Sequence, residues 1–545
     1  MTTAKLAYVH GTSATPLLGE TIGENLRRTV LRVPDAEALV VCSQGFRATY
    51  SQLWAWTGQA ARGLMALRVQ RGDRVGIWSP NRAEWVIAQY AAARIGAVLV
   101  NINPAYRADE LQYALRQSGV SVLLLAKRHR GSEYAAMVAE VMPGCPALRL
   151  TIVFEDGWDA LLAGGSSVSE DDLAAREASL QFDDPVNIQY TSGTTGSPKV
   201  ATLSHHNILN NGFYIGEALR YGERDRVCIP VPFYHCFGMV IGNLACTSHG
   251  ACMVIPGEAF DPLATLAAVQ EERCTSLYGV PTMFIAELEH PRFAEFDLGS
   301  LRTGVMAGSP CPVETMKQVQ SRMHMHEVTI CYGMTETSPV STQSAVDDPF
   351  EPRVTTVGRV HPHLEVKIVD PESGAIVPRG VRGELCTRGY SVMLGYWNDP
   401  AATRAAIDEA RWMHTGDLAV IDDAGYVSIV GRIKDLIIRG GENIYPREVE
   451  ELLHTHACVS EAQVIGVPSQ RYGEEVMAWV KLRPGAAATA EALRQHCLAR
   501  LARFKVPVYW KFVDGFPMTV TGKIQKYRMR EIAVAELEQG AVRRE

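Results

Sequence analysis

Short apolar runs alternate with stretches of helical periodicity through much of the chain. Apolar runs typical of strands occupy residues 74–78, 97–101 and 120–125, and segments with apolar residues at helical spacing occupy 83–94 and 108–117. Strands that alternate with helices form parallel sheets with helices on their faces. The pattern therefore predicts a doubly wound α/β subdomain.

The alternation continues beyond residue 150 and then begins again. Strands are predicted at 152–154 and 187–190, and the small, polar and acidic residues of 164–184 indicate a surface excursion between them. The elements expected in the next block are strands at 226–231, 251–255 and 276–280, a buried helix at 238–247 and a helix at 261–272. We therefore expect a second doubly wound α/β subdomain.

The pattern changes in the last third of the chain. From Val354 onward it shortens to strands separated by Gly and Pro turns, which predicts a small β-rich subdomain. A compact α+β pattern of about 110 residues follows, enough for one small domain. We place the boundary at Lys434, so that residues 1–433 form a large N-terminal domain and residues 434–545 a small, mobile α+β C-terminal domain.

Composition narrows the functional classes. Hydrophobic residues make up 47% and charged residues 21%, the net charge is −7, and no block of Lys and Arg occurs, which disfavours nucleic-acid binding. The 12 cysteines include no C-x-x-C pair, so neither a zinc site nor a disulfide framework is indicated, and we expect reduced thiols in the cytoplasm. No apolar run reaches the ~18 residues of a transmembrane helix, although peripheral membrane contact stays open.

One short stretch, residues 190–199, has the composition of a phosphate-binding loop. Glycines let backbone N–H groups turn toward an anion, hydroxyls donate further hydrogen bonds, and a lysine adds positive charge. It is not a Walker loop, because two residues separate Gly196 from Lys199 and Val200 stands where a hydroxyl is required. The candidate nucleotide-binding residues in it are Thr191, Ser192, Gly193, Thr194, Thr195, Gly196, Ser197, Pro198 and Lys199.

Further motifs follow at wide intervals. Tyr332-Gly333-Met334-Thr335-Glu336-Thr337 combines an aromatic plate, a hydroxyl and a carboxylate, which can stack on a base, contact a phosphate and hold a hard cation. The other motifs are His414-Thr415-Gly416-Asp417-Leu418, Gly431-Arg432-Ile433-Lys434-Asp435, Arg439-Gly440-Gly441-Glu442-Asn443-Ile444-Tyr445-Pro446 and Pro517-Met518-Thr519-Val520-Thr521-Gly522-Lys523-Ile524. Taken singly, each is also compatible with an ordinary turn or helix cap.

Together, and in this order over residues 30–535, these motifs resemble those of the AMP-forming adenylate synthetases. That superfamily includes acyl-CoA synthetases, non-ribosomal peptide adenylation domains and beetle luciferases. The resemblance implies an ATP site in which Tyr332 stacks on adenine, Thr335 contacts the α-phosphate and Glu336 binds Mg²⁺. It further implies that Asp417 and Arg432 bind the ribose.

The same resemblance gives roles to residues of the C-terminal part. Lys434 occupies the hinge position, about which the C-terminal domain rotates between the two half-reactions, and Gly441 lies in the loop that meets the pantetheine arm of coenzyme A. Lys523 matches the adenylation lysine, whose charge offsets the repulsion between the substrate carboxylate and the α-phosphate.

Two stretches match those that the superfamily uses around its acyl substrate. Residues 232–238 resemble the gate of the acyl tunnel, with His235 at the gating position, and Ala307, Gly308 and Ser309 match the loop beside the acyl group. Residues 229–248 contain no Asp or Glu that could pair with an ammonium group, which favours an apolar acid over an amino acid.

The resemblance is strongest to the medium-chain fatty acyl-CoA synthetases. It implies a ligase of fatty acid metabolism that uses ATP, Mg²⁺ and coenzyme A and acts as a monomer or homodimer. An aryl or branched-chain acyl-CoA ligase, a stand-alone adenylation enzyme that loads a carrier protein and luciferase-type oxygenation remain open. The presence of Lys523, Glu336, Asp417 and Arg432 argues against a catalytically dead scaffold. The chain length of the acid and the pathway are not determined by the sequence.

Overall fold

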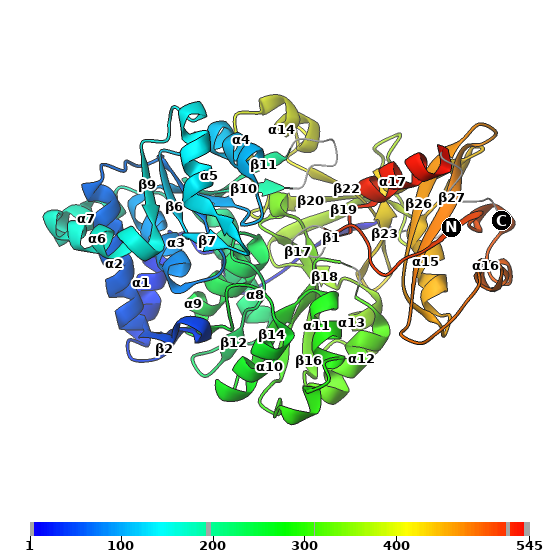
Figure 1. Ribbon diagram of the computed structural model, residues 1–545, viewed down its shortest axis with the longest axis horizontal. Helices are drawn as coiled ribbons and strands as arrows, with labels where there is room; N and C mark the ends of the chain where they lie inside the picture. The colour runs from blue at the N-terminus through cyan, green and yellow to red at the C-terminus, as the bar shows by residue number, and fades with distance from the viewer. Residues whose placement is uncertain (1–4, 192–197, 310, 519–523, 539–545) are drawn as a thin grey trace. The chain divides into compact units, whose positions relative to one another are not determined.

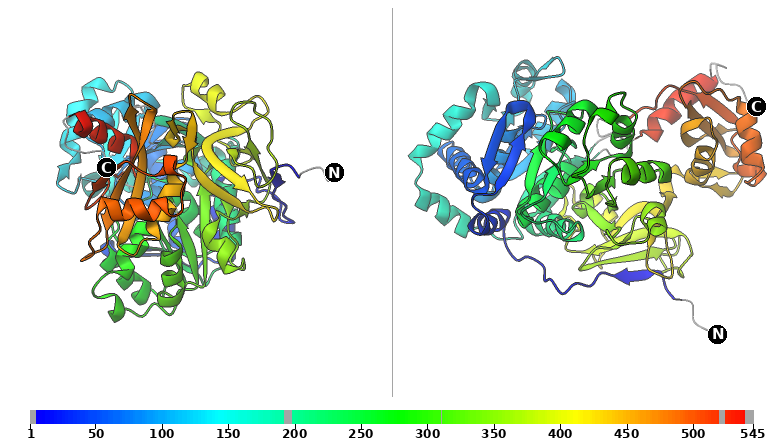
Figure 2. Two further views of the ribbon diagram at one scale, coloured as in Figure 1. Left: turned by 90° about the vertical axis from the view of Figure 1, so that its right-hand side faces the viewer. Right: turned by 90° about the horizontal axis from the view of Figure 1, so that it is seen from below.

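The computed structural model describes residues 5–191, 198–309, 311–518 and 524–538 (Figures 1 and 2). The chain divides into two compact units. The first consists of Met1–Tyr8, Lys367–Cys386 and His414–Glu545, and the second of Val9–Val366 and Thr387–Met413. The boundary that we placed at Lys434 falls inside the first unit and stays a prediction. Among the described residues, no helix combines the length and apolarity needed to cross a membrane.

The second unit contains a seven-stranded sheet with a parallel centre. Its strands, in spatial order, are β21 (Gly395–Tyr396), β11 (Lys199–Ser204), β10 (Pro185–Thr191), β5 (Val98–Ile102), β4 (Arg74–Trp78), β6 (Val122–Leu125) and β9 (Leu150–Val153). The pairs from β10 to β9 are parallel, whereas β11 is antiparallel to both of its neighbours. β5 and β6 are buried along their whole length, as expected of parallel strands covered on both faces.

A nine-stranded sheet forms the other half of this unit. Its order is β18 (Arg359–Val360), β17 (Val340–Gln343), β16 (Glu327–Gly333), β15 (Thr303–Ala307), β14 (Ser276–Gly279), β12 (Arg226–Cys228), β13 (Cys252–Ile255), β2 (Glu37–Val41) and β3 (Phe46–Thr49). The strands from β16 to β2 are parallel. The expectation of two doubly wound α/β subdomains is thus met by two largely parallel sheets.

Helices cover both faces of each sheet. One apolar core lies between the two sheets and contains α1 (Ile22–Arg32), α2 (Tyr50–Ala66), α3 (Ala83–Ile95), α8 (His205–Ala218), η4 (Phe237–Leu244) and α9 (Ala245–His249). The outer face of the seven-stranded sheet packs on α4 (Ala108–Ser118) and α5 (Tyr134–Val141). That of the nine-stranded sheet packs on α10 (Pro262–Glu271), α11 (Pro281–Leu288) and α12 (Val313–Arg322).

Two segments contain geometry that the sequence-based expectations did not include. Residues 164–184 are largely exposed, as expected of a surface excursion, but α7 (Glu170–Ala178) forms there, with the Ser169 hydroxyl accepting a hydrogen bond from Asp172 N–H. The buried helix expected at 238–247 is present, but its first part, η4, is a π-helix, and only α9 has α-helical geometry. Such π-helical turns are rare and occur often at functional sites.

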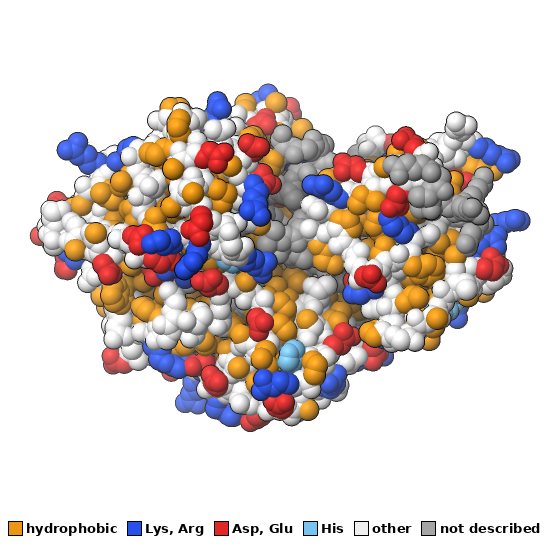
Figure 3. Space-filling view, viewed as in Figure 1, with side chains coloured by type: hydrophobic (Ala, Val, Ile, Leu, Met, Phe, Trp, Pro, Cys, Tyr) orange, Lys and Arg blue, Asp and Glu red, His pale blue; other side chains and the backbone are white. Residues whose placement is uncertain are grey.

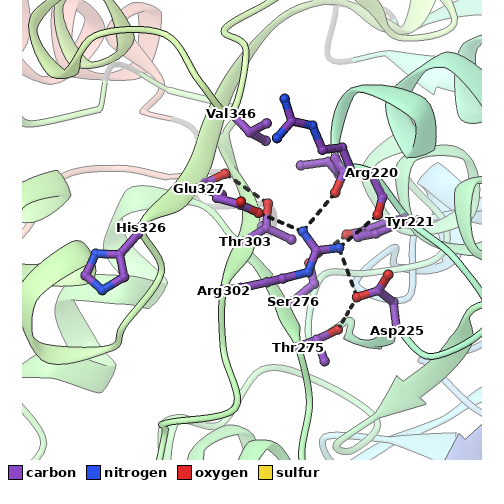
Figure 4. A network of polar contacts seen from close by, with 12 residues as sticks. Arg220, Tyr221, Asp225, Thr275, Ser276, Arg302, Thr303, His326, Glu327 and Val346 are labelled. Carbon is purple, nitrogen blue, oxygen red and sulfur yellow. Dashed lines mark hydrogen bonds and ion pairs between the residues drawn. The ribbon is translucent and has the colours of Figure 1, made fainter.

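A half-buried charge network connects α8 to the sheet (Figure 4). Arg302, at the start of β15, donates to the backbone oxygens of Leu219 (3.1 Å) and Arg220 (3.0 Å), which follow the last turn of α8. The same guanidinium pairs with Asp225 (3.0 Å) and Glu327 (2.8 Å). A cation is favourable at a helix C-terminus. The network therefore fixes the start of β15, the strand that ends at a predicted substrate residue.

The first unit carries two sheets. One has the order β1 (Tyr8–His10), β19 (Leu364–Val369), β20 (Gly383–Gly389), β22 (Met413–Ile421) and β23 (Val427–Arg432), as expected for the β-rich subdomain. The other contains β25 (Glu442–Ile444), β24 (Ile437–Arg439), β27 (Gly473–Leu482) and β26 (Val459–Ser469), with β28 (Tyr509–Phe512) beside β27.

Strict alternation along β27 explains how the second of these sheets is covered on both faces (Figure 2). Val476, Ala478 and Val480 pack with α15 (Pro446–His454) and α16 (Ala490–Leu498), whereas Met477 and Trp479 pack with α17 (Lys526–Glu538). α17 was not among the predicted elements. Figure 3 shows Lys and Arg side chains interspersed with Asp and Glu side chains over the described residues of the face in view.

Candidate active site

The loop with phosphate-binding composition connects two strands of the seven-stranded sheet. β10 ends at Thr191 and β11 begins at Lys199, and these two residues are antiparallel partners, with the Thr191 hydroxyl donating to the Lys199 backbone oxygen (3.4 Å). The loop therefore follows the carboxyl end of a parallel strand, where ligands collect in α/β sheets. Pro198 also belongs to the described residues, whereas the predicted residues Ser192, Gly193, Thr194, Thr195, Gly196 and Ser197 lie outside them.

A buried carboxylate lies near the end of this loop. Glu336, in η6 (Thr335–Thr337), is 5% exposed, and the Tyr396 hydroxyl donates to its Oε1 at 3.0 Å. Lys199 Nζ lies 4.9 Å from the centroid of the Tyr396 ring, a cation–π distance. Burial, reinforced by the Glu336 carboxylate, raises the pKa of Tyr396, so that its phenol stays protonated and able to donate. Tyr396 thus connects two predicted site residues.

The backbone of the Tyr332–Thr337 motif is held by close packing. Tyr332 is half-buried near the end of β16, and Thr335 is buried just beyond it. A Cβ on Gly333 would lie 1.7 Å from the backbone oxygen of Pro339, so only glycine fits there. The next residue, Met334, donates its N–H to the same oxygen at 2.9 Å. The motif's glycine is therefore required by the fold itself.

The predicted acyl-side residues lie at the ends of two packed elements. His235 precedes η4, and its Nδ1 accepts a hydrogen bond from Phe237 N–H at 3.1 Å, which places the hydrogen of the neutral ring on Nε2. All eight residues of η4 are buried. Ala307, the last residue of β15, is buried, Gly308 adopts φ +93°, and Ser309 is half-buried.

An ion pair joins the two predicted ribose-binding residues in the first unit. Asp417 of β22 and Arg432 of β23 are partners across the strand pair, and Arg432 Nε donates to Asp417 Oδ1 at 2.9 Å. Asp417 is 8% exposed, and half of the Arg432 side chain is exposed. Lys434 follows in an exposed turn, η7 (Ile433–Asp435).

The segment that contains Gly441 is a hairpin that leads into a helix. Residues 437–444 form a β-hairpin in which Gly440 (φ +59°) and Gly441 (φ +89°) make the two-residue turn between β24 and β25. Two positive φ angles are typical of the tight turn that suits such hairpins. Pro446 is the first residue of α15, as expected. Lys523, the predicted adenylation lysine, lies outside the described residues.

Sequence reasoning missed two residues that hold the predicted ones in place. Tyr396 binds Glu336, and no local pattern indicates a contact between positions so far apart. Glu384 accepts a hydrogen bond from Gly416 N–H (3.1 Å) and pairs with His414 (2.9 Å), so it fixes the turn that leads to Asp417. Its place among the short strands expected after Val354 was the available signal.

Comparisons with known proteins identify the family of this chain. The AMP-binding enzyme family matches residues 26–397, and the C-terminal domain of AMP-binding enzymes matches residues 448–523. YngI of Bacillus subtilis is 48% identical over 94% of this chain and 97% of its own. The mitochondrial medium-chain acyl-CoA ligase ACSF2 of Danio rerio is 44% identical over 97% of this chain and 91% of its own.

The fold agrees as well. The crystal structure of ATP-bound MatB from Rhodopseudomonas palustris superposes with a TM-score of 0.83 at 31% identity, over 94% of this chain and 98% of that one. The α/β fold class predicted from the sequence is therefore confirmed. The chain belongs to the AMP-binding enzyme family, as an AMP-forming ligase of the acyl-CoA synthetase superfamily.

Proposed function

We propose that this enzyme ligates a medium-chain fatty acid to coenzyme A through an acyl-adenylate, with release of AMP and pyrophosphate. The observation that carries the proposal is the similarity, over 97% of the chain, to a protein named as a medium-chain acyl-CoA ligase. The apolar character of η4 supports it. No Asp or Glu occurs between Ile229 and Ser248, so a substrate ammonium group would have no carboxylate partner in this segment.

The nucleotide is assigned to residues of four of the motifs described above. We assign the adenine to Tyr332, the phosphates to Thr335 and to residues 191–199, and the ribose to Asp417 and Arg432. The ion pair between the buried Asp417 carboxylate and Arg432 supports the ribose assignment, because it holds the acceptor carboxylate in a fixed orientation.

Glu336 is the residue that we assign to Mg²⁺. Carboxylate oxygens are the ligands that Mg²⁺ prefers, and Tyr396 holds this carboxylate through one oxygen, Oε1. When bound, the ion neutralises phosphate charge during attack on the α-phosphorus. Glu336 is only 5% exposed, so its charge acts in surroundings of low dielectric constant, where electrostatic interactions are stronger than in water.

The remaining assignments concern the acid and coenzyme A. We assign the gate of the acyl tunnel to His235 and the wall beside the acyl group to Ala307, Gly308 and Ser309. We further propose that a domain of residues 434–545 rotates about Lys434 and brings Gly441 to the pantetheine arm. No protein nucleophile is required, since catalysis rests on positioning and charge.

We also propose a cytoplasmic enzyme that is a monomer or homodimer. All twelve cysteines lie in the described part of the chain and none of them forms a disulfide, which is usual in a reducing compartment.

The experiment that tests the proposed chemistry separates the two half-reactions. We expect Lys523→Ala to abolish adenylate formation from ATP and a medium-chain acid, because the charge that offsets the two anions is lost. Thioester formation from supplied acyl-AMP and coenzyme A should stay largely intact. Pyrophosphate release and thioester yield are measured separately, and loss of both in a folded variant would refute this division.

A further inference from the structure

Three side chains of different chemistry converge in the first unit. His414 Nδ1 lies 2.9 Å from Glu384 Oε2 and 3.5 Å from Cys386 Sγ. One ligand atom from each residue lies within 4.8 Å of the other two. An ion bound at about 2.0 Å to nitrogen and oxygen and about 2.3 Å to sulfur would hold tetrahedral ligands roughly 3.5 Å apart.

The sheet places these side chains together. Glu384 and Cys386 are alternate residues of β20, so both project from the same face, and His414 lies on β22, the next strand in the sheet. The Thr415 hydroxyl donates to the Leu385 backbone oxygen at 2.7 Å, which fixes the two strands relative to each other. The ligand positions are therefore set by strand geometry and do not depend on a loop.

We propose that Glu384, Cys386 and His414 form a binding site for a borderline divalent cation, with Zn²⁺ as the best fit. The three donors are oxygen, sulfur and nitrogen, a set that suits Zn²⁺, whereas Mg²⁺ prefers oxygen ligands alone. A carboxylate, a thiolate and a neutral imidazole together balance the charge of a divalent ion. A site that is neutral overall suits these buried and half-buried residues.

The surroundings of the three residues support this assignment. Gly416 N–H donates to Glu384 Oε1 at 3.1 Å and so orients the carboxylate with Oε2 toward His414 Nδ1. Outer hydrogen bonds of this kind orient metal ligands in proteins. Cys386 is fully buried, whereas 35% of the His414 side chain is exposed, which gives the ion a path from solvent and leaves the fourth position for water.

Binding of a cation to these three residues would have a structural consequence. The ion would join β20 to β22 three residues before Asp417. Binding would displace the thiol proton of Cys386 and the hydrogen on His414 Nδ1, so that the bound neutral imidazole has its hydrogen on Nε2. The spacing in sequence hides the site, since Cys386 and His414 come from different strands and no C-x-x-C pair is present.

Cobalt titration of the full-length protein tests the proposal. Co²⁺ is added to reduced, metal-free protein, and the thiolate-to-cobalt charge-transfer absorption is followed. We expect one equivalent to saturate this band, and excess Mg²⁺ to leave it unchanged. Cys386→Ser should abolish the band, and Glu384→Gln should weaken Co²⁺ binding by at least tenfold.

Cys458→Ser is the matched control, since it removes a half-buried thiol of the same unit that is not in the cluster. It should retain the band and the parent affinity. Absence of a band in the parent would overturn the proposal, as would a band that persists in Cys386→Ser. Thermal unfolding midpoints of the metal-free variants show whether they fold. If Cys386→Ser is unstable, the Co²⁺ affinity of Glu384→Gln tests the proposal instead, and an affinity equal to that of the parent would overturn it. These readouts involve no ATP, so they are independent of the proposed ligase reaction.

Discussion

At the scale of single residues, the contact between Tyr396 and Glu336 can be tested most directly. Its hydroxyl donates to the buried carboxylate of Glu336, and β11 holds its backbone through the pairing of Ala201 with Tyr396. A hydrogen bond to a charged group contributes about 1.5–3 kcal/mol. Loss of the hydrogen bond from Tyr396 should leave the Glu336 carboxylate buried but poorly oriented.

We predict that Tyr396→Phe raises the concentration of free Mg²⁺ needed for half-maximal activity by on the order of tenfold. Pyrophosphate release at fixed ATP, measured against free Mg²⁺, checks this. Tyr214→Phe is the control, because it removes another buried phenol, one that donates to Thr15 (2.8 Å), without touching Glu336. An unchanged Mg²⁺ dependence in Tyr396→Phe would show that this contact does not orient the carboxylate.

At the scale of elements, the hairpin turn at Gly440 and Gly441 allows the proposed contact with coenzyme A to be tested. A Cβ at Gly441 meets no atom within 4 Å, so Gly441→Ala introduces only the cost of a left-handed conformation, roughly 1–2 kcal/mol. If coenzyme A approaches this backbone closely, the added methyl group should slow the thioester half-reaction and spare adenylate formation.

Gly485→Ala is the matched control for Gly441→Ala. Gly485 also has a positive φ (+75°) and open space around its Cβ position, so both variants bear the same conformational cost. Single-turnover rates of the two half-reactions are compared. Equal thioester rates in both variants would remove the argument that coenzyme A meets Gly441.

The elements also show what the sequence could and could not reveal. Most of the parallel strands were predictable because they are apolar runs between helical patterns, whereas β2, β15 and β16 were not among the predicted strands. α7 was missed because its residues are small and acidic, although Ser169 and Asp172 form a helix-start signature that was present in the sequence. The π-helical geometry of η4 had no signal in its uniformly apolar residues, which suit a buried helix of either kind.

The candidate site was predictable where its motifs are local and unpredictable where it depends on tertiary contacts. Asp417 and Arg432 stand in separate motifs, and only the pairing of β22 with β23 brings them together. Tyr396 and Glu384 act on other site residues from distant positions, so no local spacing marks them.

At the scale of the whole molecule, two buried histidines should make stability depend on pH. His205 accepts a hydrogen bond from Ile22 N–H (3.1 Å), and burial lowers the pKa of His205 to about 4. Burial likewise lowers the pKa of His361 to about 4. Unfolded histidine titrates near 6.5. The unfolded chain therefore binds more protons than the folded chain between these values, and stability falls as the pH drops from about 6.5 to about 4.

The contribution of His205 can be isolated by substitution. A pKa difference of this size corresponds to about 3 kcal/mol in the free energy of unfolding. We predict that His205→Gln, whose amide oxygen can accept from Ile22 N–H, loses less thermal stability than the parent over this pH range. His326→Gln replaces an exposed histidine and should follow the parent. If His205→Gln also follows the parent, His205 is not the group responsible.

The measurement that tests the central proposal most directly is a panel of carboxylic acids, from acetate through medium and long straight chains to benzoate and branched acids. Pyrophosphate release and thioester formation are measured with and without coenzyme A. We expect turnover that requires coenzyme A and is greatest with medium-chain acids, because the predicted acyl side is apolar and lacks a carboxylate. A single turnover of adenylate with no coenzyme A product, or no activity with any acid, would contradict the proposed function.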